Sequence, residues 1–146
     1  MTVLVIDAQG GGIGKQLVAG LKKQLPEAFV WAVGTNAAAT GAMLKAGADR
    51  AATGENAAVV ACRSADLIMG PIGIVIADSL FGEITAAIAA AVGRSSAKRI
   101  LVPFDQCETF IPGYSELPLA VRIQAAVDTA GKLAEKALGA EAETRS

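Results

Sequence analysis

The sequence contains no histidine. Histidine is the commonest general base near neutral pH and the commonest protein ligand for metals. Its absence excludes a serine or cysteine nucleophile that a histidine activates. With only two cysteines in the chain, the ordinary ligand sets of zinc are excluded as well. The sequence therefore predicts no metal site, and it assigns no residue a catalytic role.

Cysteine is also scarce, and the two examples are Cys62 and Cys107. Two cysteines do not make the framework of a disulfide-rich domain. Cys62 lies in the apolar part of a predicted helix, so we expect a core residue. Cys107 follows a predicted strand, so we expect it near the crevice that the loops after the strands form. Because no histidine is present to activate it, we expect an inert thiol.

Basic clusters and long apolar runs are missing as well. The formal net charge is −1, and basic residues adjoin each other only at Lys22-Lys23 and Lys98-Arg99. Proteins that bind nucleic acid carry a larger basic patch. No apolar run reaches the roughly 18 residues of a membrane-spanning helix, and the start of the chain lacks the pattern of a secretory signal. We expect a cytoplasmic protein that binds neither nucleic acid nor a membrane.

Aromatic residues are few, at 4% of the chain, whereas hydrophobic residues make up 53%. The core must therefore be aliphatic, which suits a parallel sheet with helices on both faces. A chain of 146 residues fits one domain. We predict a three-layer α/β/α Rossmann-like domain over residues 1–139, followed by a frayed tail over residues 140–146.

Short aliphatic runs alternate with helical patterns along the chain. A mostly parallel five-stranded sheet follows, for which we prefer the strand order 3-2-1-4-5 over 2-1-3-4-5. We expect strands at 2–7, 28–33, 48–52, 66–70 and 100–104, and helices at 13–25, 36–47, 53–62, 82–92 and 118–139. Residues 72–80 fit a strand or a helix. We favour a helix, because Gly70-Pro71-Ile72-Gly73 repeats the strand–turn–helix pattern of the first loop.

The most informative stretch is the glycine-rich run between the first predicted strand and helix. It reads Gln9-Gly10-Gly11-Gly12-Ile13-Gly14-Lys15. Free backbone N–H groups at the start of a helix in such a run form a site for an anion, usually a phosphate. We therefore predict that this loop binds a small phosphorylated or nucleotide ligand. The plain alternative is that the glycines only permit a tight turn.

Two enzyme patterns match the loop in part. The dinucleotide pattern G-x-G-x-x-G is not met, because Lys15 or Leu17 stands where the third glycine is needed. Gly12-Ile13-Gly14 resembles the loop of short-chain dehydrogenases. However, Tyr114 is followed four positions on by a proline, so the Tyr-x-x-x-Lys of that family is absent. An NAD(P)-dependent oxidoreductase is thus the less supported alternative, with NAD(P) or another nucleotide as its cofactor.

The run from Gln9 to Gln16 also resembles the P-loop of ParA/MinD-type ATPases. The resemblance puts Lys15 at the position of the phosphate-binding lysine. Gly10 replaces the signature lysine, and Gln16 replaces the Ser or Thr whose hydroxyl binds Mg²⁺. These differences predict phosphate binding without efficient ATP hydrolysis.

The loops after the other predicted strands extend the candidate site, because parallel strands end at one edge of a sheet. The residues added are Thr35, Asn36, Glu55, Asn56, Gly70, Pro71 and Gly73. The first four also fit the plain role of helix caps or first-turn residues. We interpret Asp78, Ser79 and Glu83 as helix-surface or capping residues.

Several stretches together resemble a bacterial family of small proteins known as a domain of unknown function. They are 5–16, 34–37, 43–48, 52–57, 70–74 and 82–85 within residues 2–112. The resemblance implies a Rossmann-like domain and no established activity. Members of that family have Asn-Arg-Cys where this chain has Asp105-Gln106-Cys107, so an arginine that would suit an anion is missing.

The apolar segment Ile72–Phe81 is longer than a short crossover needs, and Leu80 and Phe81 are expected beside the crevice. We therefore predict a homodimer. A second reading of the whole protein is a non-catalytic regulatory or assembly module whose glycine loop is purely structural.

Overall fold

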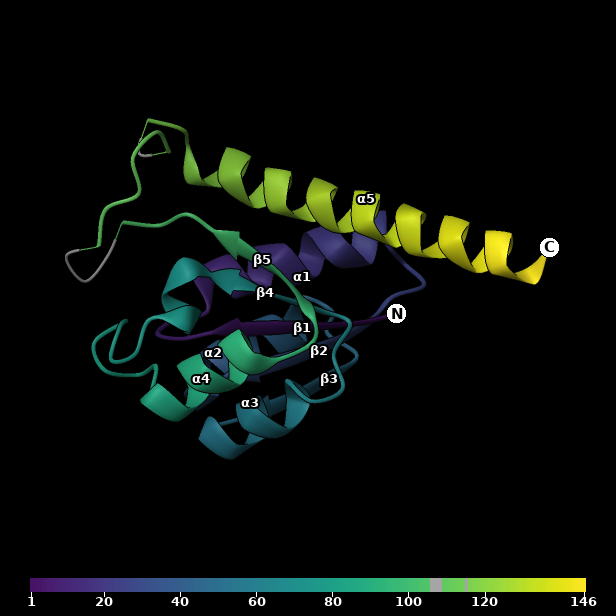
Figure 1. Cartoon of the computed structure of the whole chain (residues 1–146). Coiled ribbons are helices and arrows are strands. Elements are labelled where there is room, and N and C mark those ends of the chain that lie inside the picture. Colours follow the sequence, from purple (N-terminus) through teal and green to yellow (C-terminus); the bar gives the residue numbers. More distant parts are fainter. Residues whose placement is uncertain (106–108, 115) are drawn as a thin grey trace.

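The computed structural model of the 146-residue chain describes residues 1–105, 109–114 and 116–146. It shows a parallel sheet of five strands in the order β3-β2-β1-β4-β5 (Figure 1). The predicted α/β class, the Rossmann-like architecture and the preferred strand order are confirmed. The strands are β1 (Thr2–Asp7), β2 (Phe29–Gly34), β3 (Arg50–Thr53), β4 (Leu67–Pro71) and β5 (Lys98–Val102).

The central strand is β1, which pairs with β2 on one side and β4 on the other. Successive side chains of a strand point to opposite faces of the sheet. Val3 and Val5 accordingly belong to the core cluster on one face, and Leu4 and Ile6 to the cluster on the other. All four are fully buried, so an uninterrupted aliphatic run is what this position requires.

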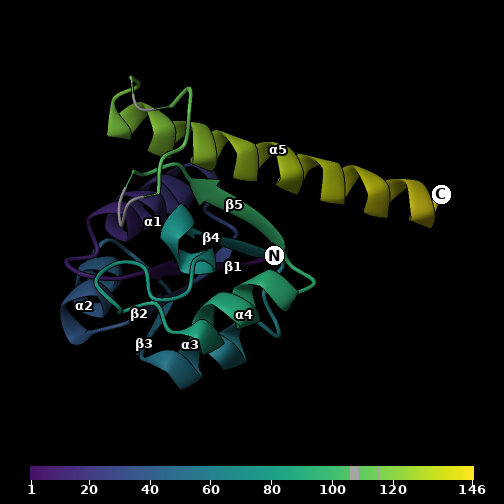
Figure 2. The same cartoon turned by 60° about the vertical axis from the view of Figure 1, so that its left-hand side comes forward.

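The helices cover both faces of this sheet. Figure 2 shows α1 and α5 on one face and α3 and α4 on the other, and the two core clusters divide in the same way, with α2 joining the first through Met43. The helices are α1 (Gly12–Gln24), α2 (Ala37–Lys45), α3 (Glu55–Ala61), α4 (Ala86–Arg94) and α5 (Leu119–Arg145). No helix within the described ranges is both long enough and apolar enough to span a bilayer.

The segment between β4 and α4 differs from its prediction. Instead of a helix over residues 72–80, a short 3₁₀-helix, η1 (Ile72–Val75), is followed by turns, and α4 begins at Ala86 rather than at residue 82. The cause lies in the backbone, because Asp78, Leu80 and Phe81 have φ angles of 64°, 54° and 58°. Positive φ is incompatible with a right-handed helix. The other predicted boundaries before residue 118 differ from the observed ones by at most two residues.

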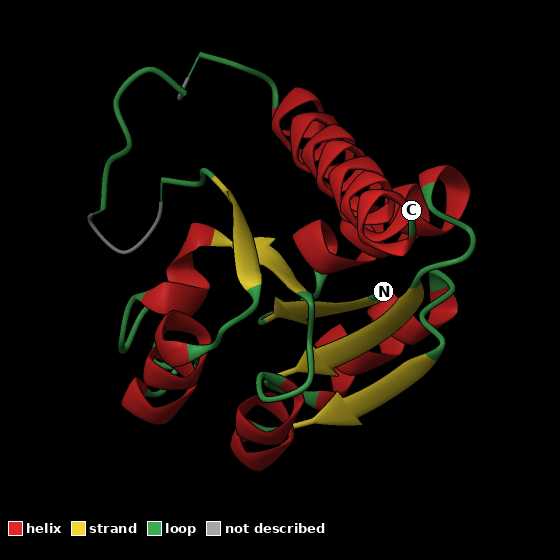
Figure 3. Cartoon of the chain, turned by 45° about the vertical axis from the view of Figure 1, so that its right-hand side comes forward, coloured by secondary structure: helices red, strands yellow, loops and turns green. Residues whose placement is uncertain are grey.

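The last helix is longer than predicted. We expected its end at Gly139, but α5 continues to Arg145. A glycine ends a helix when it adopts a left-handed conformation, and Gly139 does not have a positive φ. Figure 1 shows this helix reaching past the end of the sheet, and Figure 3 shows the same helix nearly along its axis. The division into a domain of residues 1–139 and a frayed tail stays a prediction.

Candidate functional site

The glycine-rich run lies at the carboxyl end of the central strand β1 and opens α1, as its sequence position predicted. Gly11 is the residue immediately before the helix, with a φ of 71°. Its N–H donates a hydrogen bond of 3.0 Å to the carbonyl oxygen of Ala8, which closes a tight turn. The loop therefore combines a turn with a helix N-terminus at the edge of the sheet where α/β proteins bind ligands.

The four glycines of this loop differ in what the fold requires of them. Gly11 has the left-handed conformation that favours glycine. A Cβ atom on Gly14 would lie 2.6 Å from the sulfur of Met43. By contrast, a Cβ atom on Gly10 or Gly12 would meet nothing within 4 Å, and neither residue has a positive φ. The fold therefore requires glycine at positions 11 and 14, whereas a side chain would have room at positions 10 and 12.

The carboxyl group of Asp7 occupies part of the helix N-terminus. Its Oδ2 accepts a hydrogen bond of 2.6 Å from the N–H of Gly14, and its Oδ1 accepts one of 2.8 Å from the N–H of Ala8. The side chain is 5% exposed. Burial raises the pKa of Asp7 and the nearby Glu83 adds to the effect, against the lowering by the amide hydrogen bonds. A carboxyl group of the chain itself therefore holds an amide that we had expected to bind the ligand.

Two amides of the loop remain available. The N–H groups of Gly10 and Gly12 have no hydrogen-bond partner among the described residues. Both glycines line a pocket of about 210 Å³. The other residues around it are Asp7, Ala8, Gln9, Ile13, Gln16, Pro71, Leu80, Phe104 and Leu119. The pocket joins a polar wall made by the loop to an apolar wall made by more distant segments.

Lys15 and Gln16 lie on the first turn of α1. Both side chains are exposed, and Lys15 is not among the residues that line the pocket. Gln16 donates a hydrogen bond of 2.9 Å from Nε2 to the carbonyl oxygen of Gly12. The side chain at the magnesium position of the P-loop resemblance thus bonds to the loop itself.

Sequence reasoning missed the residue that connects the loops of the crevice. Glu83 follows the turns after η1, and its Oε1 accepts three hydrogen bonds from two loops. The donors are the N–H of Gln9 at 3.1 Å, Oγ1 of Thr35 at 2.8 Å and Nδ2 of Asn36 at 2.7 Å. Partial burial acts to raise the pKa of Glu83, but these hydrogen bonds outweigh it and the pKa is lowered.

Glu83 also places a carboxylate at the end of β2. The sequence has no acidic residue directly after β2, where dinucleotide-binding domains place one. Through Thr35 and Asn36, Glu83 brings a carboxylate to that place from 47 or 48 residues further along the chain. No local pattern marks such a contact, so the surface or capping role expected for Glu83 is wrong.

Thr35 and Asn36 are joined by hydrogen bonds to Glu83, although neither residue lines the pocket. Asn36 caps α2 by accepting a hydrogen bond of 2.9 Å from the N–H of Ala39. Its Nδ2 also donates to the carbonyl oxygen of Gln9 at 2.9 Å. The predicted capping role is therefore present, and the same side chain ties the loop after β2 to the loop after β1.

The remaining predicted residues divide into two groups. Glu55 and Asn56 are exposed at the start of α3 and do not line the pocket. Pro71 lines it, while Gly70 lies against the backbone of β1, where a Cβ atom would overlap a carbonyl oxygen. Gly73 accepts a hydrogen bond from the buried hydroxyl of Ser79 at its carbonyl oxygen. Gly70 and Gly73 thus have structural roles in the described fold.

The two cysteines have separate outcomes. Cys62 is buried, as predicted, and burial raises the pKa of its thiol to about 11. Such a thiol is protonated at neutral pH and therefore a poor nucleophile. Cys107, together with Gln106, lies outside the described residues. Within the described ranges, acidic and cysteine side chains do not gather in groups of three or more that suit a metal ion.

A family model with the description "Domain of unknown function (DUF3842)" matches residues 2–135. The chain belongs to this family. The match confirms the resemblance to a family of unknown function that the sequence stretches carry. No curated protein matches the chain.

One solved structure provides a further comparison for this DUF3842 member. The crystal structure of the dodecameric FMN-dependent UbiX-like decarboxylase from Escherichia coli O157:H7 is 18% identical in sequence, with a TM-score of 0.47. The match covers 90% of this chain and 76% of the other. Dependence on FMN and assembly into a dodecamer are properties of that protein.

Proposed function

We propose that this protein binds a small phosphorylated or nucleotide ligand in the crevice after β1, with the phosphate against the N–H groups of Gly10 and Gly12. The observation that carries the proposal is that both amides lack a partner among the described residues and that both glycines line the pocket. They lie at the N-terminus of α1, where the helix dipole favours negative charge.

Charge and size define the ligand further. Lys15 is exposed on the first turn of α1 and supplies a positive charge beside the loop. The pocket of about 210 Å³ is smaller than the roughly 300–1,000 Å³ of sites that enclose a drug-sized molecule. We therefore propose that the pocket takes the phosphate end, while the sugar or nucleotide part extends along the crevice toward Glu83.

Glu83 suits the hydroxyl groups of such a ligand. Its Oε1 accepts the three hydrogen bonds from the flanking loops, which hold the carboxylate in place. The two oxygens of a carboxylate have about four lone-pair sites, so Oε2, to which no described residue donates, can still accept hydrogen bonds. The proposed role of Glu83 is therefore to accept hydrogen bonds from sugar hydroxyls at the end of β2.

The test is a titration with defined probes: inorganic phosphate, ribose 5-phosphate and AMP. Backbone amide resonances of Gly10 and Gly12 are followed by NMR, and binding is expected to shift both. Gly12→Ala should abolish the shift, because the added methyl group fills the space that the anion needs. Gly139→Ala is the matched control, since a Cβ atom there also meets nothing within 4 Å. Unchanged Gly10 and Gly12 resonances with all three probes would contradict the proposal.

Asp7 favours a second candidate function, a non-catalytic regulatory or assembly module. Its carboxyl group already satisfies the amides of Gly14 and Ala8, as a purely structural loop requires. This candidate predicts that no nucleotide or sugar phosphate raises the melting temperature, whereas a ligand at about 100 times its Kd adds roughly 2.7 kcal/mol. The only feature that supports an NAD(P)-dependent oxidoreductase is the Gly12-Ile13-Gly14 pattern.

We also propose that the chain works as a homodimer, although the segment Ile72–Phe81, from which the sequence predicts it, exposes less apolar surface than expected. Ile74 and Leu80 are buried in the core of the single chain, so the apolar segment Ile72–Phe81 mostly packs internally. Phe81 is its exposed member, at 89%. A dimer therefore needs a larger apolar surface elsewhere.

A further inference from the structure

The glycine loop begins with a tight turn, which the hydrogen bond from the N–H of Gly11 to the carbonyl oxygen of Ala8 closes. The first central residue of this turn, Gln9, has a φ of 53°, and the second, Gly10, does not have a positive φ. This combination is the pattern of a type II′ turn, in which the first central position favours glycine. The chain therefore has a strained glutamine where a glycine would cost less.

The side chain of Gln9 adds a second cost at the same position. Its Nε2 is buried and has no hydrogen-bond partner among the described residues. A buried donor without an acceptor is destabilising. Backbone strain and unpaired polar groups of this kind are found at functional sites, where the surrounding structure holds them in place. Gln9 lines the pocket beside Gly10 and Gly12, so the strained turn is part of the pocket wall.

The peptide between Gln9 and Gly10 is the part of the turn that can rotate. Type I′ and type II′ turns differ in the orientation of this central peptide, and the type I′ form needs a positive φ at the second position as well. Glycine adopts positive and negative φ about equally readily, so Gly10 allows both forms. The residues of the turn therefore do not determine where the N–H of Gly10 points. A contact from outside the turn has to fix this direction.

Asn36 supplies that contact. Its Nδ2 donates a hydrogen bond of 2.9 Å to the carbonyl oxygen of Gln9. The peptide between Gln9 and Gly10 is trans, so its C=O and N–H groups point in opposite directions. Because Asn36 holds the carbonyl oxygen, the N–H of Gly10 points away from Asn36. Gly10 lines the pocket, whereas Asn36 does not.

The side-chain amide of Asn36 is itself held in one orientation. Its Nδ2 also donates to Oε1 of Glu83 at 2.7 Å, and its Oδ1 accepts a hydrogen bond of 2.9 Å from the N–H of Ala39. The two donor hydrogens of the amide thus have one acceptor each. Turning the amide over would place Oδ1 against two acceptor oxygens and lose all three hydrogen bonds. Asn36 therefore connects the turn firmly to α2 and to Glu83.

We propose that Asn36 is a positioning residue of the phosphate site: through the carbonyl oxygen of Gln9, it directs the N–H of Gly10 toward the ligand. The inference rests on the function proposed above and gives Asn36 a role besides the capping of α2. Since Asn36 does not line the pocket, it acts through the peptide and does not touch the ligand.

The first test measures the direction of the Gly10 N–H without any ligand, from its residual dipolar coupling in NMR. Asn36→Ser removes the donor but keeps an oxygen that caps α2, since serine caps helices about as well as asparagine. The coupling of Gly10 should change, while the couplings along α1 and α2 stay as in the wild type and show that the variant is folded.

A second substitution tests the direction of the change. Adding Gly10→Ala to Asn36→Ser should return the coupling of residue 10 toward the wild-type value, because alanine disfavours the positive φ of the rotated form. A Cβ atom at this position meets nothing within 4 Å. Asn56→Ser is the matched control, since Asn56 is exposed on the first turn of α3. It should leave the coupling of Gly10 unchanged.

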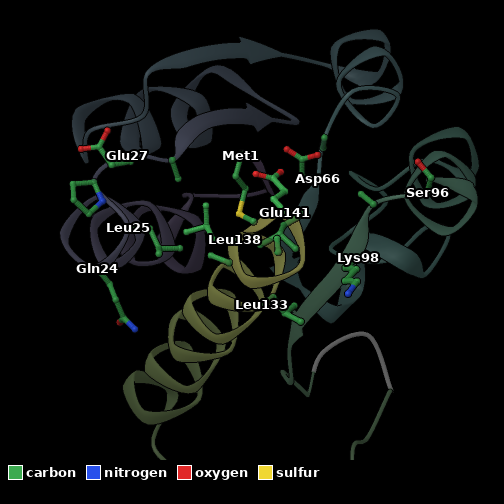
Figure 4. Close-up of a pocket in the computed structure, with 17 residues that line it drawn as sticks. Met1, Gln24, Leu25, Glu27, Asp66, Ser96, Lys98, Leu133, Leu138 and Glu141 are labelled. Atoms are coloured by element: carbon green, nitrogen blue, oxygen red, sulfur yellow. The ribbon is translucent and has the colours of Figure 1, made fainter. Parts of the chain in front are cut away.

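Titration with inorganic phosphate, followed at the amide of Gly12, tests the consequence for binding. Asn36→Ser should weaken binding about tenfold or more, since a hydrogen bond to a charged group loses its geometry. Asn56→Ser should bind as the wild type does. The amide of Lys98 is the reference in the same spectra. Lys98 begins β5 and lines a groove of about 650 Å³ at the opposite edge of the sheet (Figure 4), so its resonance should not shift.

The two measurements separate this inference from the proposed function. A Gly10 coupling that is the same in Asn36→Ser and the wild type would overturn the role of Asn36, whatever the phosphate titration gives. Equal and measurable phosphate affinities of these two proteins would overturn it as well. A wild type that does not bind phosphate, with a Gly10 coupling that depends on Asn36, would contradict phosphate binding and support the positioning of the peptide by Asn36.

Discussion

Oε1 of Glu83 lies 2.7 Å from Nδ2 of Asn36, although 47 residues separate them in the chain. The same oxygen accepts hydrogen bonds from the N–H of Gln9 and the hydroxyl of Thr35. One carboxylate therefore joins the loops after β1 and β2 to the segment before α4. These hydrogen bonds hold together the loops that flank the crevice in which we propose that the ligand binds.

The first prediction concerns the charge of Glu83. Its folded-state pKa is lowered from the ordinary value of 4.5, so its ionised form stabilises the fold above that value, and this contribution is lost as the pH falls through the lowered pKa. We expect Glu83→Gln to lower the free energy of unfolding at pH 7 and to have a smaller effect below the lowered pKa. Urea denaturation of both proteins from pH 3 to 7 measures this. A difference independent of pH would contradict the prediction.

The second prediction concerns Asp7, whose pKa changes in the opposite direction. Asp7→Asn should lower the free energy of unfolding by about 1–3 kcal/mol, since one of two buried amides loses its acceptor. The folded-state pKa is raised from 3.8, so the stabilisation by Asp7 is complete below that value and declines as the pH rises through the raised pKa. The difference between wild type and Asp7→Asn should therefore shrink from pH 4 to pH 8 in denaturation curves.

The third prediction compares two glycines of the same loop. Gly14→Ala should lower the free energy of unfolding by about 1–3 kcal/mol, because the new Cβ atom would lie 2.6 Å from the sulfur of Met43. Gly12→Ala should leave it unchanged or raise it by up to about 1 kcal/mol, since alanine favours a helix over glycine. Chemical denaturation of both variants checks the order. Equal losses would mean that the loop tolerates no side chain at all.

The fourth prediction concerns the strained turn at Phe81. Its φ is 58° and its side chain is 89% exposed. Phe81→Gly removes the strain of a left-handed conformation, worth about 1–2 kcal/mol, and loses little burial. We expect a raised melting temperature. Phe110→Gly is the control, because Phe110 is 78% exposed but has no positive φ. Its melting temperature should stay the same or fall.

The fifth prediction concerns catalysis. Gln16 stands at the position where a P-loop needs a hydroxyl for Mg²⁺, and its side chain bonds to the carbonyl oxygen of Gly12. We expect no Mg²⁺-dependent ATP hydrolysis at ~1 s⁻¹ or faster, within the ordinary range of enzymes. A phosphate-release assay measures it. A rate in that range that Lys15→Ala abolishes would show that the loop works as a P-loop after all.

The sequence by itself determined the elements whose signal is local. The aliphatic run Val3–Ile6 predicts a strand buried on both faces, and the glycines after it predict a turn into a helix. Both are present, and the glycine loop lies at the end of the central strand. Side-chain periodicity and backbone freedom act over a few residues, so a reader of the sequence can recognise them.

Only the tertiary structure decided which groups meet in the crevice. Glu83 reaches Gln9 across 74 residues, and the positive φ angles at Asp78 and Leu80 are incompatible with the helix that the glycine–proline pattern predicted over residues 72–80. Asp7 turned inward onto the amide of Gly14, which no spacing rule indicates. These outcomes depend on packing between segments distant in sequence. Such packing can override local preference, because burial and hydrogen bonding repay the cost of an unfavourable backbone.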